Sequence, residues 1–140
     1  GWCHLSFAMA LSMLAGGLAT SFLMPEKAAI GASGGVMGLL GFLLVFETLH
    51  QRLVPRSSRR RLLGALGVTL MVGFIGYQFI DNFAHGGGLL AGMLYAGIVF
   101  PHSDSSRRPR TTKRDMALGV IGILVLITSA IWAGLLLLAA

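Results

Sequence analysis

Residues 31–50 read GASGGVMGLLGFLLVFETLH, an apolar run of membrane-spanning length that opens with a serine among glycines. A second apolar run, residues 83–100, carries His85 near its start. A helix of about 20 apolar residues crosses a hydrocarbon core of about 30 Å. Neither core packing nor simple anchoring requires a serine and a histidine near corresponding ends of two such helices. Ser33 and His85 therefore form a candidate nucleophile and base.

The composition is that of an integral membrane protein. The 140 residues are 55% hydrophobic and 11% charged, whereas soluble domains carry about 25% charged residues. The apolar runs are apolar on all sides, which favours helices over the alternating strands of a barrel. We therefore predict an all-α fold, a polytopic membrane helical bundle. Five spans are expected, at about 4–23, 32–50, 62–80, 83–100 and 116–139.

The basic residues predict the orientation of these spans. A pI near 10.8 is found in many nucleic-acid-binding proteins. Here, however, ten of the 11 Lys and Arg residues lie in two short segments, 52–61 and 107–114, between alternate pairs of spans. Positive charge confined to such loops indicates that they face the cytoplasm. We therefore expect no nucleic-acid partner, and we expect Ser33 and His85 to share the outer layer of the bilayer.

Each polar candidate also has a purely structural interpretation. A serine in a membrane helix usually packs or bonds to a carbonyl of its own helix, and His85 can extend to the interface. Asp81 or Asn82 can cap the helix that follows. No His, Cys, Asp and Glu residues have metal-site spacing, so neither a metal nor a cofactor is expected. Three other histidines near span ends are expected at the membrane interface: His4, His50 and His102.

Small residues recur at four-residue spacing on the two helices that carry the candidates. Gly34 and Gly38 lie on the first, and Gly88 and Gly92 lie on the second. This spacing lets helix backbones approach each other closely. Such an approach is what a serine–histidine hydrogen bond of about 2.6–3.2 Å requires.

Two stretches of the sequence resemble the motifs of one family. Residues 31–41 resemble the G-x-S-G motif of the rhomboid intramembrane proteases, and residues 81–92, DNFAHGGGLLAG, resemble their histidine motif. Both stretches occur in the family's order and on alternate helices. The resemblance covers about residues 10–100, and it implies that residues 1–140 form a single rhomboid-like membrane domain.

The resemblance also implies a function. Rhomboid proteases are serine endopeptidases that cleave single transmembrane helices near the outer membrane face. By this resemblance Ser33 would be the nucleophile and His85 the general base, without the carboxylate of a soluble triad. The backbone at Gly31, Ala32 and Ser33 would form the oxyanion hole. Five other residues would support the site: Asn82, Met37, Gly34, Gly88 and Gly92.

Two features depart from the family pattern. The family's His-x-x-x-Asn motif, which assists the oxyanion from a preceding helix, is absent, because His4 and Ala8 have the spacing but not the amide. Met37 stands where the family often has an aromatic residue. We therefore expect a partial domain, with further helices before Gly1 and with weak or no proteolysis by this piece alone.

Two non-catalytic interpretations stay open beside the protease. One is a rhomboid-like protein that binds transmembrane helices, and the other is a small transporter or channel whose polar path includes Ser33 and His85. All three interpretations imply the lipid bilayer, and the protease and the helix-binding protein also imply transmembrane-helix proteins as substrates or partners. The short connections between the spans favour a bacterial inner membrane as the location.

Overall fold

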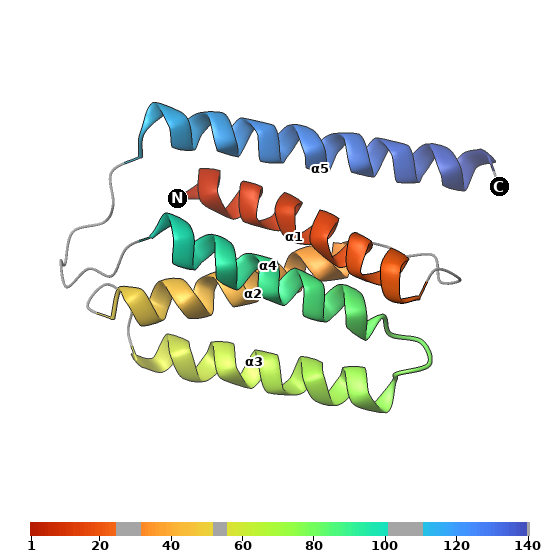
Figure 1. The fold of residues 1–140 in the computed structure, drawn as a ribbon, viewed down its shortest axis with the longest axis horizontal. Coiled ribbons are helices and arrows are strands. Elements are labelled where there is room, and N and C mark those ends of the chain that lie inside the picture. The colour runs from red at the N-terminus through yellow and green to blue at the C-terminus, as the bar shows by residue number, and fades with distance from the viewer. Residues whose placement is uncertain (25–31, 52–55, 101–110, 140) are drawn as a thin grey trace.

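The computed structural model describes residues 1–24, 32–51, 56–100 and 111–139, which form an all-helical bundle (Figure 1). The predicted all-α fold is confirmed. Several predicted features lie outside the described residues, namely Gly31, His102 and residues 52–55 and 107–110 of the two Arg-rich segments. The helices are α1 (Trp2–Leu23), α2 (Ala32–Leu49), α3 (Arg56–Ile75), α4 (Asn82–Val99) and α5 (Lys113–Ala139).

The third helix departs most from its predicted bounds of 62–80. It begins at Arg56, because the run of serines and arginines there continues into the helix, and arginine is a good helix former. It ends at Ile75, and residues 76–79 form a turn. Within this turn the backbone N–H of Ile80 donates to the carbonyl of Gly76 at 2.9 Å.

The prediction of five membrane spans is overstated. By length and apolar composition, three of the described helices can cross a membrane: α1, α2 and residues 113–136 of α5. The apolar part of α3, from Leu62 to Ile75, rises only about 21 Å at 1.5 Å per residue, which is short of a bilayer core. Helix α4 has 18 residues and includes Asn82, His85 and several glycines, which lower its apolar character.

Helices α1, α2 and α4 form the centre of the bundle and meet backbone to backbone. A Cβ atom added to Gly88 would overlap the backbone of Gly34, and one added to Gly92 would overlap that of Gly38. On α1, a Cβ at Gly16 would lie 2.7 Å from the carbonyl oxygen of Ala84. The three helices can approach this closely only because glycine has no side chain.

The two outer helices lie on opposite sides of this centre (Figure 1). Helix α5 packs on α1 through two glycines: a Cβ at Gly119 would lie 2.6 Å from the Cα of Cys3, and one at Gly122 would lie 2.7 Å from the backbone nitrogen of Phe7. Helix α3 packs chiefly on α2, and its contact is sparse. Most of its apolar side chains are therefore exposed to the surroundings of the bundle.

The alternating helix directions give the bundle two distinct ends. One end holds the first residues of α2 and α4, and therefore Ser33 and His85 (Figure 1). The other end holds the first residues of α1, α3 and α5, next to the Arg-rich segments. The buried aromatic core lies toward this second end, where Phe42, Tyr95 and Phe100 pack together.

Candidate functional site

Ser33 and His85 lie at the same end of the bundle but do not form a bonded pair. Ser33 is the second residue of α2, and its side chain is exposed. His85 is one turn into α4 and half-buried. Among the described residues, no hydrogen bond joins the serine hydroxyl to the imidazole. Ala32, from the predicted oxyanion hole, is also exposed, and Gly31 lies outside the described residues.

The start of α4 is fixed by Asp81, the residue before the helix. One oxygen of its carboxylate accepts hydrogen bonds from the backbone N–H groups of Phe83 at 3.1 Å and Ala84 at 3.0 Å. The other oxygen accepts a hydrogen bond from the hydroxyl of Thr20, which is fully buried in the last turn of α1. Asp81 therefore caps α4 and ties it to α1. This arrangement sets the position of His85.

The side chain of Asn82 is held by a hydrogen bond to helix α3. Its side-chain amide donates a hydrogen bond to the carbonyl oxygen of Gly73 at 2.9 Å. Gly73 is buried, and a Cβ there would collide with the Asn82 side chain. Asn82 thus fastens the beginning of α4 to the last turn of α3.

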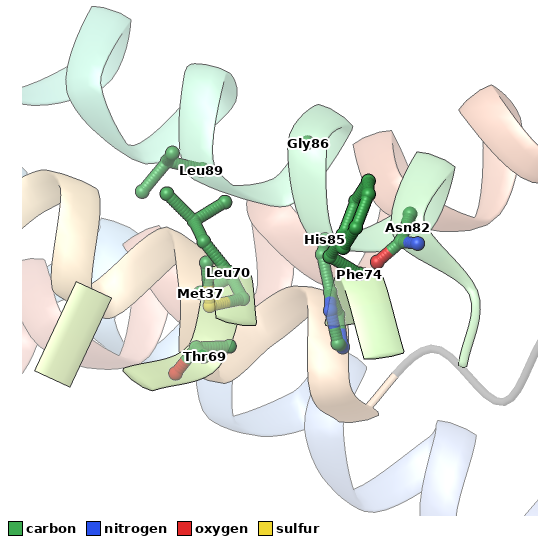
Figure 2. Close-up of a pocket in the computed structure, with 8 residues that line it drawn as sticks. All are labelled: Met37, Thr69, Leu70, Phe74, Asn82, His85, Gly86 and Leu89. Carbon is green, nitrogen blue, oxygen red and sulfur yellow. The ribbon is translucent and has the colours of Figure 1, made fainter. Parts of the chain in front are cut away.

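A cavity of about 240 Å³ lies between α2, α3 and α4 and is called the His85 cavity below. Figure 2 shows His85 and Asn82 of α4 with Phe74 of α3 at one end of it. Its lining is mostly apolar, and Ser33 is not part of it. The eight lining residues are Met37, Thr69, Leu70, Phe74, Asn82, His85, Gly86 and Leu89.

The predicted supporting residues divide into two groups. Met37 lines the His85 cavity, as do Asn82 and the histidine itself. Gly34, Gly88 and Gly92 lie instead in the backbone contact between α2 and α4. The structure therefore brings the histidine and its neighbours together around one cavity and leaves the serine outside it.

A second polar group, which sequence reasoning missed, lies at the other end of the bundle. His4 is buried, and its Nδ1 is 3.0 Å from the hydroxyl of Tyr95, while its Nε2 is 3.6 Å from a carboxylate oxygen of Asp115. His50 is only 2% exposed and stacks on Phe46. Both side chains are therefore packed inside the bundle: Tyr95, Phe100 and Asp115 cover His4, and Phe46 and Phe100 cover His50. Their expected position at the membrane interface stays a prediction.

The predicted topology contained a signal for this group. It places the start of the first and fifth spans and the end of the fourth in one layer, and each of these ends carries one polar residue of the group. Three polar side chains at one depth are natural hydrogen-bond partners in a membrane.

With regard to metals, the described part of the chain has no cluster of three or more His, Cys, Asp or Glu residues that could hold an ion.

Comparison with known proteins gives the family. Residues 1–102 match the Rhomboid domain. The chain is 28% identical over 139 residues to inactive rhomboid protein 1 of Danio rerio, covering 99% of this chain and 16% of that protein. It is 29% identical over 119 residues to inactive rhomboid protein 2 of Homo sapiens, covering 84% of this chain and 14% of that protein.

A plant protein is also similar. The chain is 29% identical over 108 residues to RHOMBOID-like protein 6, mitochondrial, of Arabidopsis thaliana, covering 75% of this chain and 34% of that protein. The chain thus spans about one third or less of the length of these relatives. No solved structure matches.

These relatives correct the predicted activity. The prediction of a serine endopeptidase is wrong, because the fish and human relatives that match most of the chain are inactive rhomboid proteins. The geometry agrees, since the hydroxyl of Ser33 is exposed outside the cavity that His85 lines. The family itself is confirmed, because the Rhomboid domain match covers residues 1–102 of 140 and the helices form a membrane bundle. This chain belongs to the rhomboid family.

Proposed function

We propose that this chain is the membrane domain of a non-catalytic rhomboid protein, which binds transmembrane helices of other proteins. The observation that carries the proposal is that, among the described residues, no hydrogen bond joins the two candidate catalytic side chains: His85 lines the cavity, whereas the exposed Ser33 does not. Catalysis by a dyad needs the nucleophile and base within hydrogen-bond reach. Binding of a helix needs only a shaped surface.

The surface that suits a partner helix is the side of the bundle formed by α3 and the His85 cavity. Phe74 of α3 is 84% exposed beside this cavity, and Leu70 is 59% exposed one turn earlier. Within a bilayer, helices associate through close packing and a few polar contacts, because lipid is as apolar as the helices themselves. The half-buried imidazole of His85 supplies such a polar contact inside a mostly apolar cavity.

Site-specific crosslinking tests this binding surface. A photoreactive amino acid is placed at Phe74 of the full chain in native membranes, together with a co-expressed single-span test protein. The matched control is the same reactive residue at Leu124, which is also exposed, at 56%, and belongs to α5, the helix on the opposite side of the bundle from α3 (Figure 1). We expect several-fold more adduct from position 74. Equal adduct at both positions would show only random encounters in lipid and would contradict the proposed surface.

The non-catalytic character has its own test, with a fluorophosphonate that labels activated serines. We expect the full chain to show no labelling above that of Ser33→Ala, because an unactivated serine hydroxyl is a weak nucleophile. Ser33→Ala should also retain helix binding within about twofold. Labelling that disappears in Ser33→Ala would show an activated serine and would overturn the non-catalytic assignment.

The protein is integral to a membrane, and we propose that its Arg-rich segments face the cytoplasm. The positive-inside rule supports this orientation, since segments 52–61 and 107–114 follow α2 and α4, which run in the same direction. The relatives include animal proteins and a mitochondrial plant protein. The bacterial inner membrane therefore stays a prediction from the short loops alone.

A further inference from the structure

A second cavity, called the Glu47 pocket, lies between α2 and α3 near the Arg-rich end of the bundle. Its volume is about 320 Å³. The His85 cavity shares no lining residue with it and lies toward the opposite end. Its walls combine apolar side chains with one carboxylate, one hydroxyl and one guanidinium: Leu43, Phe46, Glu47, Ser58, Arg61 and Leu62.

Glu47 is the unusual member of this pocket. It is the only charged residue in α2, and it is just 5% exposed. Its Oε2 atom is buried and has no hydrogen-bond partner among the described residues. A buried carboxylate without a partner is strongly destabilising, because desolvation of its charge is not offset. Among the described residues, nothing offsets the desolvation of this carboxylate oxygen.

The position of Glu47 within its helix also favours a bound cation. Glu47 lies in the last turn of α2, where the unpaired carbonyl groups carry partial negative charge. A second negative charge at that place is unfavourable, whereas a bound cation would be stabilised by both the carboxylate and the helix end. Arg61 lines the same pocket but is exposed, and no ion pair joins it to Glu47 in the described part of the chain.

We propose that the Glu47 pocket receives a Lys or Arg side chain that flanks the transmembrane helix of a partner protein. This inference rests on the proposed helix-binding function. The partner obeys the same positive-inside rule as this chain, so its flanking cations lie on the side of the Arg-rich segments. The apolar walls, Leu43, Phe46 and Leu62, suit the methylene stem of the cation, and the carboxylate suits its charged head.

The experiment uses two synthetic transmembrane peptides with the same apolar core of about 20 residues. One peptide carries two lysines at one end, and the other carries two serines there. Their binding to the full chain is measured by fluorescence in detergent micelles, for the wild type, Glu47→Gln and the neighbouring exposed control Thr48→Val. We expect Glu47→Gln to weaken binding of the lysine peptide about tenfold. Binding of the serine peptide should stay within about twofold, and Thr48→Val should change neither.

A charge reversal gives the complementary result. Glu47→Lys should bind a peptide flanked by two glutamates better than the wild type does, and Glu47→Gln keeps the proposal testable where the reversed variant does not fold. Equal binding of the lysine and serine peptides by the wild type would overturn the pocket assignment and leave helix binding intact. Binding of neither peptide would overturn both. Equal loss of thermal stability in Glu47→Gln and Arg61→Gln, with unchanged peptide binding, would assign the carboxylate to Arg61 and overturn the proposal.

Discussion

Gly92→Leu is expected to unfold the centre of the bundle. A Cβ atom at position 92 would overlap the backbone carbonyl group of Gly38, so no side-chain rotation can relieve the clash. Helices α2 and α4 would have to separate by the width of a side chain. Overpacking of a well-packed core commonly costs about 1–3 kcal/mol, and a clash with backbone lies at or above the upper end of that range. We therefore expect a loss of about 3 kcal/mol or more.

The matched control for this variant is Gly97→Leu, on the same helix. Gly97 is exposed, and a Cβ added there meets nothing within 4 Å. Both variants insert the same side chain, so differences in membrane insertion or helix propensity cancel between them. Thermal unfolding in detergent, followed by size-exclusion chromatography, measures the effect. A Gly92→Leu protein as stable and monodisperse as Gly97→Leu would contradict the backbone contact between α2 and α4.

The helices could be predicted from the sequence because membrane insertion depends on local composition. The long apolar run of residues 32–49 is bounded on both sides by polar or proline-containing segments, and the observed α2 agrees with it within one residue. The number of spans was overstated because apolar character continues past Ile75, where the chain turns instead of extending the helix. The turn is closed by backbone hydrogen bonds from Phe79 and Ile80 to the carbonyl of Gly76, which the apolar composition of the segment does not indicate.

The site was only partly predictable, because contacts between helices depend on rotation about each helix axis. Topology placed Ser33 and His85 at one end, but it could not show that one is exposed and the other lines a cavity. A sequence motif gives only residue types and their spacing. It therefore does not distinguish a catalytic serine–histidine dyad from the same two residues in a non-catalytic protein. Glu47 was visible as the only charge within an apolar run, yet its burial without a partner follows from the packing of α3 on α2.

Asp81→Ala is expected to detach the start of α4 and destabilise the fold by about 2–4 kcal/mol. Loss of a helix N-cap costs about 1 kcal/mol, and the variant removes the acceptor of two backbone N–H groups, those of Phe83 and Ala84. It also removes the charged acceptor of the buried Thr20 hydroxyl, which keeps only the carbonyl oxygen of Gly16 at 3.2 Å, and a hydrogen bond to a charged group contributes about 1.5–3 kcal/mol. Because α4 carries His85, the proposed helix binding at the His85 cavity should weaken together with stability.

Asp81→Asn is the matched control, and a double-mutant cycle with Thr20→Val isolates the link between helices. An asparagine at this position keeps an oxygen for the two backbone N–H groups, and its amide can donate to the Thr20 hydroxyl, so we expect a loss below about 1 kcal/mol. Thr20→Val alone removes the hydroxyl and should cost less than Asp81→Ala. Because the two residues are in contact, their combined loss should be smaller than the sum of the single losses. Additive losses in the thermal unfolding measurements would show that Asp81 acts only as a cap and that α1 and α4 are held together by their glycine contacts alone.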